Sequence, residues 1–399
     1  MAALYHRAIA GDFIVLPARI DVPFADQGKL RFNLGSVCKR FSSQIRTSES
    51  AIMERFLNTP AHQHVGTDVS RRHFLKSAAG TALVATGLPT TALANPPPKD
   101  RSISPESLVG RLYHSLSGEQ KNIVCFDWDH QDTKRGLLRT FIANNWNITP
   151  AEIQSDFYTP EQKVLIREIF EGIIQPDWHK RIDKQLQDDA GGFGHRQSLA
   201  IFGDPNSDTF EFVMTGRHMT LRCDGNSVPQ MAFGGPIFYG HAAAGFHEAS
   251  DHPGNVFWPQ AVAANKVFAM LDGNQRKAAL VQPSPPEKAV GFGGPESSRP
   301  GISVRDLSQD QQVEMQKVLA KLIEPYRQTD QNKVQACLEA QGGLDQCNLA
   351  FYSDQDIGKD GIWDNWRLEG PAFVWYFRGS PHVHVWVHIA DNPDIPLNA

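Results

Sequence analysis

The chain has 399 residues, a formal net charge of −5 and 41% hydrophobic residues. This balance is typical of a folded globular protein, and the absence of a basic excess excludes an electrostatic surface for nucleic acid. After residue 94 no apolar run approaches the length of about 20 residues that a membrane-spanning helix needs. We therefore expect no stable membrane span in the mature protein.

Residues 70–94 have the pattern of a twin-arginine export signal. Its parts follow in the usual order, namely Arg71-Arg72, Phe74-Leu75-Lys76, the weakly apolar run Ser77–Leu88 and the small-residue cleavage site Ala92-Leu93-Ala94. Thr81 and Thr86 make the apolar run too polar, and it is too short, to anchor the chain in a bilayer. The pattern predicts export of the folded protein by the twin-arginine machinery, cleavage after Ala94 and a periplasmic or secreted location.

The position of this signal divides the chain. Such signals belong at an N-terminus, so we expect residues 1–69 to be an extension upstream of the true start or a disordered segment, with Met53 as an alternative start. Residues 95–106 open with Asn95-Pro96-Pro97-Pro98 and predict a stiff linker. The remaining residues, 107–391, predict the folded domain.

An internal repeat is visible within this domain. Three pairs of segments resemble each other in the same order and at nearly the same offset, namely Leu116–Lys121 with Leu271–Arg276, Thr159–Ile173 with Ser308–Leu322, and Leu199–Asp204 with Leu349–Asp354. The first two pairs each enter a helix through a cap residue. The sequence thus predicts an α+β fold that is internally duplicated, with halves at about 107–223 and 261–390. In each half helices precede antiparallel strands, and the strands of the two halves meet about a pseudo-twofold axis. Unrelated helices within one large domain are the alternative.

Each predicted half ends in a β-hairpin. The two hairpins have strands with alternating apolar residues and turns at Gly216-Arg217 and at Gly379-Ser380-Pro381. Their strands are Thr209–Thr215 with His218–Cys223, and Ala372–Arg378 with His382–Ala390.

Histidines on these hairpins predict a metal site. Alternate side chains of a strand share one face, so His382 and His384 lie on the face opposite the valines, about 7 Å apart. His218 follows the equivalent turn in the first half, and the predicted axis would bring it to the same point. Three histidines leave one coordination position open, as in catalytic sites, with zinc favoured and copper or iron as alternatives. His388 lies about 13 Å beyond His384 and should not join. The alternative is a row of solvated histidines.

Two further carboxylates are candidates for catalysis. Glu248 and Asp251 lie in a Gly/Ala-rich stretch with His241, His247 and His252, shortly after the first half. Either carboxylate could act as a general base beside the metal. The alternative is a loop whose polar residues stabilise turns.

The cysteines give a separate expectation. Cys337 and Cys347 close a short loop, and an oxidising compartment would favour a disulfide between them, with two free thiols as the alternative. Cys125 and Cys223 have apolar neighbours and are predicted to be small buried residues.

These features predict an exported metal-dependent enzyme, with zinc-assisted hydrolysis ahead of copper or iron oxidation. The substrate would be a small molecule or a carbohydrate. The competing class is a non-catalytic periplasmic or cell-surface binding module, whose histidines and tryptophans line a ligand groove.

The chain resembles DUF3500, a family of uncharacterised exported bacterial proteins, over roughly Leu108–Asp391. The resemblance rests on four segments, Leu112–Gln120, Gly216–Leu221, Phe233–Pro236 and His382–His384. The family commonly has a histidine pair at Arg217-His218, so Arg217 is a departure that leaves the role of this position in doubt. His218, His382 and His384 match the family pattern. The resemblance implies no activity.

Overall fold

The structure is a computed structural model. It describes residues 103–207, 209–225, 230–248, 252, 254–358 and 360–395. The predicted N-terminal extension, the export signal, the first part of the linker and the candidate base Asp251 lie outside the described residues. Within the described part, no helix is both long enough and apolar enough to span a membrane.

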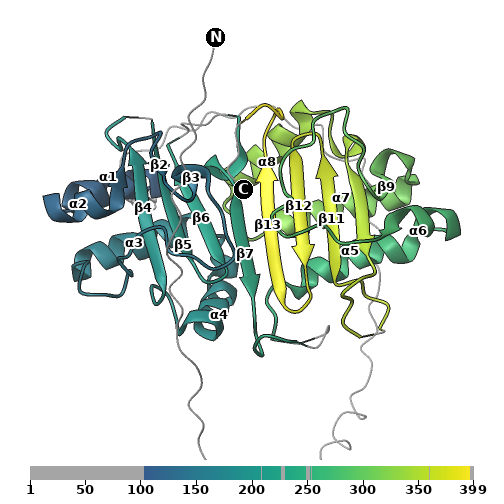
Figure 1. Cartoon of the computed structure of the whole chain (residues 1–399), viewed down its shortest axis with the longest axis horizontal. Coiled ribbons are helices and arrows are strands. Elements are labelled where there is room, and N and C mark those ends of the chain that lie inside the picture. The colour runs from purple at the N-terminus through teal and green to yellow at the C-terminus, as the bar shows by residue number, and fades with distance from the viewer. Residues whose placement is uncertain are drawn as a thin grey trace, which may run out of the picture. The chain divides into compact units, whose positions relative to one another are not determined.

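One mixed β-sheet forms the centre of the domain. Its strands are β1 (Cys125–Phe126), β4 (Gln197–Gly203), β5 (Phe210–Gly216), β6 (Met219–Asp224), β7 (Ile237–His241), β8 (Leu280–Val281), β9 (Ile302–Ser303), β10 (Asn348–Tyr352), β11 (Asn365–Gly370), β12 (Phe373–Arg378) and β13 (Val383–Ile389). They lie in the order β1-β4-β5-β6-β7-β13-β12-β11-β10-β8, with β9 beside β10 (Figure 1). A separate small hairpin pairs β2 (Gln131–Asp132) with β3 (Gly136–Leu137).

The α-helices are α1 (Pro105–Ser115), α2 (Gly118–Val124), α3 (Pro160–Ile173), α4 (His179–Ala190), α5 (Trp258–Met270), α6 (Gly273–Ala279), α7 (Gln309–Ile323) and α8 (Gln328–Ala340). Helices α1 to α4 come before strands β4 to β7 in the chain, and helices α5 to α8 come before strands β10 to β13. Caps predicted from the sequence are present, since Thr159 and Ser308 each form a reciprocal capping box with the glutamine three residues later. Helices and strands in one mixed assembly confirm the predicted α+β class.

The sheet buries both of its faces. Apolar side chains from the helices and from one sheet face form the main core, which includes Val383, Val385 and Val387 of β13. On the opposite face, smaller clusters form beneath the connecting segments 138–148 and 281–292. The alternation predicted for β13 is therefore correct, but its other face is covered by chain and is not exposed to solvent.

The pattern of parallel and antiparallel pairing is the same when the sheet is followed inward from either edge. At one edge β1 pairs in parallel with β4, and at the other β8 pairs in parallel with β10. Four antiparallel strands follow in each case, ending in β7 and β13. These two strands pair antiparallel at the centre, where teal meets yellow in Figure 1. The predicted hairpins are confirmed as β5–β6 and β12–β13.

Three expectations need correction. Cys125, predicted to be buried, is only half-buried, whereas Cys223 is buried as predicted. The expected Cys337–Cys347 disulfide is absent, since both cysteines are free and buried. The Cys337 thiol lies 3.7 Å from the carbonyl oxygen of Gln230, whereas Cys347 Sγ lies against Gly370, so the two side chains have different neighbours. The predicted linker also ends early: Ser104 caps α1 and Pro105 opens it, because proline is well suited to a first helical position.

Candidate metal centre

The β12–β13 hairpin places two of the predicted histidines. Val383 and Val385 of β13 enter the main core, so His384 between them faces the opposite side of the sheet, and His382 lies in the turn just before the strand. Both side chains are buried, with 3% of His382 and 8% of His384 exposed. The alternative of a solvated row of histidines is therefore wrong for this pair.

His218 occupies the turn between β5 and β6 in a left-handed backbone conformation, with φ of 55°. Its N–H donates to the carbonyl of Asn144 at 3.1 Å, and its own carbonyl accepts from Gly240 N–H at 3.2 Å. A non-glycine residue in this conformation costs about 1–3 kcal/mol and persists only where its surroundings fix it. In this backbone conformation the imidazole of His218 reaches across β7 towards β13.

Gly240 makes this crossing possible. It lies in β7 directly opposite His384. A Cβ atom at position 240 would lie 3.4 Å from Cδ2 of His218 and 2.3 Å from the carbonyl oxygen of Val383. Because glycine has no Cβ, the His218 ring can pass over β7 and reach the histidines of β13.

The three imidazoles converge on one point. His218 Nε2 lies 3.1 Å from His384 Nε2 and 3.2 Å from His382 Nε2. All three ligand atoms lie within 4.8 Å of one another, and no other such group of three occurs among the described residues. A tetrahedral ion with nitrogen ligands at about 2.0–2.1 Å would separate those nitrogens by roughly 3.3–3.4 Å. The three side chains could thus hold one metal ion.

The opposite ring nitrogens all contact acceptors. Nδ1 of His218 lies 2.9 Å from Asp189 Oδ2, and Nδ1 of His382 lies 2.8 Å from the carbonyl oxygen of Phe246. Nδ1 of His384 lies 3.3 Å from both carboxylate oxygens of Glu287. Carbonyl and carboxylate oxygens accept hydrogen bonds, so a proton on each Nδ1 would face an acceptor and would leave each Nε2 with a lone pair for a metal.

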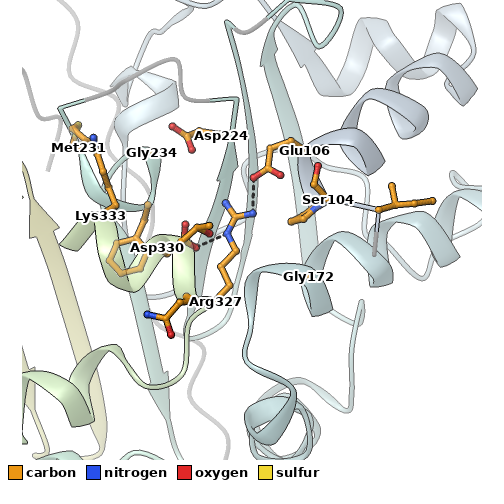
Figure 2. A pocket seen from close by; sticks show the side chains of 14 residues that line it. Ser104, Glu106, Gly172, Asp224, Met231, Gly234, Arg327, Asp330 and Lys333 are labelled. Carbon is orange, nitrogen blue, oxygen red and sulfur yellow. Dashed lines mark hydrogen bonds and ion pairs between the residues drawn. The ribbon is translucent and has the colours of Figure 1, made fainter. Parts of the chain in front are cut away.

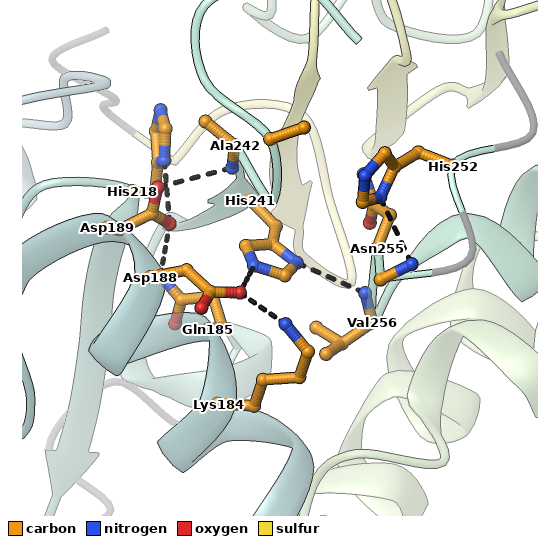
Figure 3. Close-up of polar contacts among 12 residues, drawn as sticks. Lys184, Gln185, Asp188, Asp189, His218, His241, Ala242, His252, Asn255 and Val256 are labelled. Carbon is orange, nitrogen blue, oxygen red and sulfur yellow. Dashed lines mark hydrogen bonds and ion pairs between the residues drawn. The ribbon is translucent and has the colours of Figure 1, made fainter. Parts of the chain in front are cut away.

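The acceptors are themselves held in place. Asp189, in the last turn of α4, accepts from Gln185 Nε2 at 2.8 Å and from Ala242 N–H at 3.2 Å (Figure 3). Arg217 places its Nε 3.7 Å from Oδ1 of the same carboxylate. Burial would raise the pKa of Asp189, but the hydrogen bond with His218 lowers it below its ordinary value. Asp189 therefore stays ionised behind the ring.

Glu287 is the acceptor behind His384, as Asp189 is behind His218. It forms an ion pair with Arg378 and accepts from Asn144 Nδ2 at 3.4 Å. Burial opposes ionisation, but the hydrogen bond with His384 and the charge of Arg378 lower the pKa of Glu287. Asn144 also bonds the backbone of His218, so one residue contacts both sides of the cluster.

Burial keeps the histidines neutral. Desolvation is the largest cause that lowers the pKa of His218, His382 and His384 below the ordinary 6.5. Neutral rings whose Nε2 lone pairs face one another at 3.1–3.2 Å repel. The lowered pKa of each histidine disfavours an added proton that would relieve this repulsion. A bound cation removes that repulsion.

Glu248 lies close to this cluster but outside it. Its N–H donates to Pro381 O at 3.1 Å, and its carboxylate accepts from Ala244 N–H at 3.0 Å and Asn255 Nδ2 at 3.1 Å. Its negative charge opposes the lowering of the pKa of His382. Glu248 thus holds the loop after β7 against the turn that carries His382.

Sequence reasoning missed Asp189 and Glu287, whereas His241 was noted only as part of the Gly/Ala-rich stretch. Asp188 and Asp189 end α4, where the helix dipole disfavours negative charge, and this unusual placement was the available signal. Asp188 Oδ2 lies 2.9 Å from His241 Nε2, and His241 Nδ1 accepts from Val256 N–H at 3.1 Å (Figure 3). His241 therefore ties α4 to the loop after β7 and takes no place in the cluster. His388 is also outside it, as predicted.

A separate cavity of about 570 Å³ lies at the other end of β6, beyond Asp224 (Figure 2). Arg327 crosses it, with contacts of 2.5 Å to Glu106 and 3.0 Å to Asp330. Burial raises the pKa of Asp224 to about 7 and that of Asp330 to about 6. None of the three clustered histidines lines this cavity.

Fold and site together define an α+β protein with a buried cluster of three histidines. Their Nε2 atoms converge, and each Nδ1 lies within 3.3 Å of an acceptor oxygen. The chain belongs to the DUF3500 family, described as a protein of unknown function, whose family model matches residues 104–389. No curated protein and no solved structure matches the chain.

Proposed function

We propose that this protein binds one divalent metal ion, zinc favoured, through His218, His382 and His384. The observation that carries the proposal is the convergence of three Nε2 atoms, each on a ring whose Nδ1 contacts an acceptor. Acceptors behind metal-binding histidines fix the tautomer and raise the basicity of the ligand nitrogen. Neutral imidazole is also the form that a metal requires.

We further propose a metal-dependent enzyme, with hydrolysis favoured. Structural zinc sites have four protein ligands, whereas three clustered ligands among the described residues leave a position for water or substrate. Zinc would lower the pKa of a bound water to about 7.

Glu248 remains the candidate base, because its charge acts on His382. Phe246, which is 66% exposed and packs edge-on against His382, would contact a small-molecule or carbohydrate substrate.

Elemental analysis of protein purified from its native export route tests the metal proposal. We expect close to one zinc per chain, and retention of the ion somewhat below pH 6.5, because burial lowers the pKa of all three ligands. Copper or iron at the same stoichiometry would support the oxidoreductase alternative. Metal-free protein that also fails to take up zinc on dialysis would leave the non-catalytic binding module as the better hypothesis.

We also propose export through the twin-arginine route, on the pattern at residues 70–94. The exported protein is expected to begin near Asn95, as measured by mass spectrometry of the intact chain. Replacing Arg71 and Arg72 together with lysine should retain the protein in the cytoplasm, whereas Arg111→Lys should leave export unchanged. Export of the double variant at the normal level would contradict the proposal.

We propose that the two halves arose by duplication, and paired glutamines support this. Gln120 and Gln162 exchange side-chain hydrogen bonds of 2.8 and 3.0 Å, and Gln275 and Gln311 exchange bonds of 3.1 and 2.8 Å. Each pair joins the equivalent capping boxes that the repeated segments predict. Superposition of residues 107–223 on 261–390 should give a rotation near 180°, and a clearly different rotation would contradict a pseudo-twofold axis.

A further inference from the structure

The connection between β10 and β11 contains a regular series of acidic residues. Asp356, Asp360 and Asp364 are spaced four residues apart, with Gly361 after the second. In calcium loops of the EF-hand type, ligands stand at positions 1, 5 and 9 and a glycine at position 6. With Asp356 as position 1, the three aspartates and Gly361 match these places. Gly361 has φ of 82°, the left-handed conformation that such a turn requires.

The innermost of these carboxylates is buried and incompletely bonded. Asp364 is 0% exposed. Its Oδ2 accepts from the N–H of Ile357, but Oδ1 has no hydrogen-bond partner in the part of the chain that the structure describes. A buried carboxylate is costly unless it is paired or coordinates a metal.

Neighbouring charge adds to that cost. Asp356 Oδ1 lies 3.4 Å from the N–H of Asp364, so the two residues are in contact. Two carboxylates in contact at a buried position repel each other when both are ionised. A cation between these groups would stabilise the ionised form of all three aspartates.

We infer that the 356–364 loop binds a hard divalent cation of the calcium class, with Asp356, Asp360 and Asp364 as ligands. All three donors are carboxylate oxygens, which suit calcium, whereas nitrogen donors such as those of the histidine cluster suit zinc. The three carboxylates do not all lie within 4.8 Å of one another, so at least one of them must move on binding. Gly358 and Arg367 stand where calcium loops have further ligands, so we expect an affinity at the weak end of the range.

The loop is joined to the histidine cluster through two routes. The carbonyl of Asp364 accepts from Gly379 N–H at 2.8 Å, in the turn that leads to His382. Arg378 Nη2 donates to Gln355 Oε1 at 3.0 Å, and the same guanidinium pairs with Glu287 behind His384. A cation in the loop would therefore fix the turn from which β13 begins. This inference does not depend on a metal at the histidines.

Calcium chloride titrated alone into the metal-depleted full chain, followed by calorimetry, tests the inference. We expect one calcium per chain with a Kd on the order of 10⁻⁴–10⁻³ M, and a higher Tm in calcium. Asp364→Asn keeps the size of the side chain and should weaken binding by about tenfold or more, because ligand charge tunes affinity. Asp345→Asn, which changes an exposed aspartate in the short 3-10 helix Leu344–Gln346, is the matched control.

The outcomes separate this site from the histidine cluster. His382→Ala should still bind calcium, and Asp364→Asn should still contain zinc. Absence of calcium binding by the wild-type chain, or equal binding by Asp364→Asn, would overturn the inference whatever the zinc content. Calcium binding lost in Asp364→Asn in a protein that holds no zinc would support this site while the proposed metal centre fails.

Discussion

Replacement of His384 with alanine is expected to remove bound zinc almost completely. Four-ligand zinc sites bind with about 10–16 kcal/mol, so each ligand contributes roughly 2.5–4 kcal/mol and its loss should weaken affinity about 10²–10³-fold. His384 contacts His218 at 3.1 Å and lies opposite Gly240, so removal of its ring also removes one wall of the cluster. Competition with a zinc chelator of known affinity measures the change.

Two further variants show whether the effect arises at the metal. Asp189→Asn should weaken zinc binding by about 10–100-fold, because the acceptor behind His218 changes while the ligand stays. His195→Ala removes an exposed histidine and should change nothing. Near-UV circular dichroism must show that each variant is folded. Wild-type zinc affinity in folded His384→Ala would exclude the three-histidine site.

Replacement of Gly240 with alanine is expected to destabilise both the domain and the site. The new Cβ would lie 2.3 Å from the carbonyl oxygen of Val383, a distance that β7 and β13 can accommodate only by separating. It would also press on the His218 ring, at 3.4 Å from Cδ2. Overpacking of this kind costs about 1–3 kcal/mol or more. We expect a lower midpoint in urea together with a loss of zinc.

Gly118→Ala is the matched control for this substitution. Gly118 opens α2, no atom lies within 4 Å of a Cβ added there, and its backbone is helical. Such a change stabilises by about 0.4–1 kcal/mol, since alanine restricts the unfolded chain. If Gly240→Ala has the stability and zinc content of wild type, the path of His218 across β7 is not what the structure indicates.

Several elements of the fold could be predicted because their signals are local. The alternating residues of β13 fix which side chains enter the core, and the residue pairs at Thr159 and Ser308 fix where α3 and α7 begin. The face of His384 followed from the same alternation. These features depend on neighbours a few residues apart, which is the range over which backbone geometry imposes a period.

The long-range parts of the site could not be predicted in the same way. Asp189 and Glu287 lie far from their histidines in sequence, and nothing in their local pattern specifies a partner. The Cys337–Cys347 prediction was wrong for a related reason, because proximity in the chain did not determine where each thiol packs.

The sequence alone therefore determined the α+β class, the hairpins and the three histidines, since short-range periodicity and turn chemistry encode them. Only the tertiary structure decided that β7 and β13 pair at the centre of one sheet. That pairing, with glycine at position 240, brings His218 to His382 and His384. The tertiary structure also decided which acceptors lie behind each ring, because such contacts depend on the packing of α4 and of the segment around Glu287 against the sheet. Burial by the whole fold, rather than any local pattern, lowers the pKa of the three histidines and keeps them neutral.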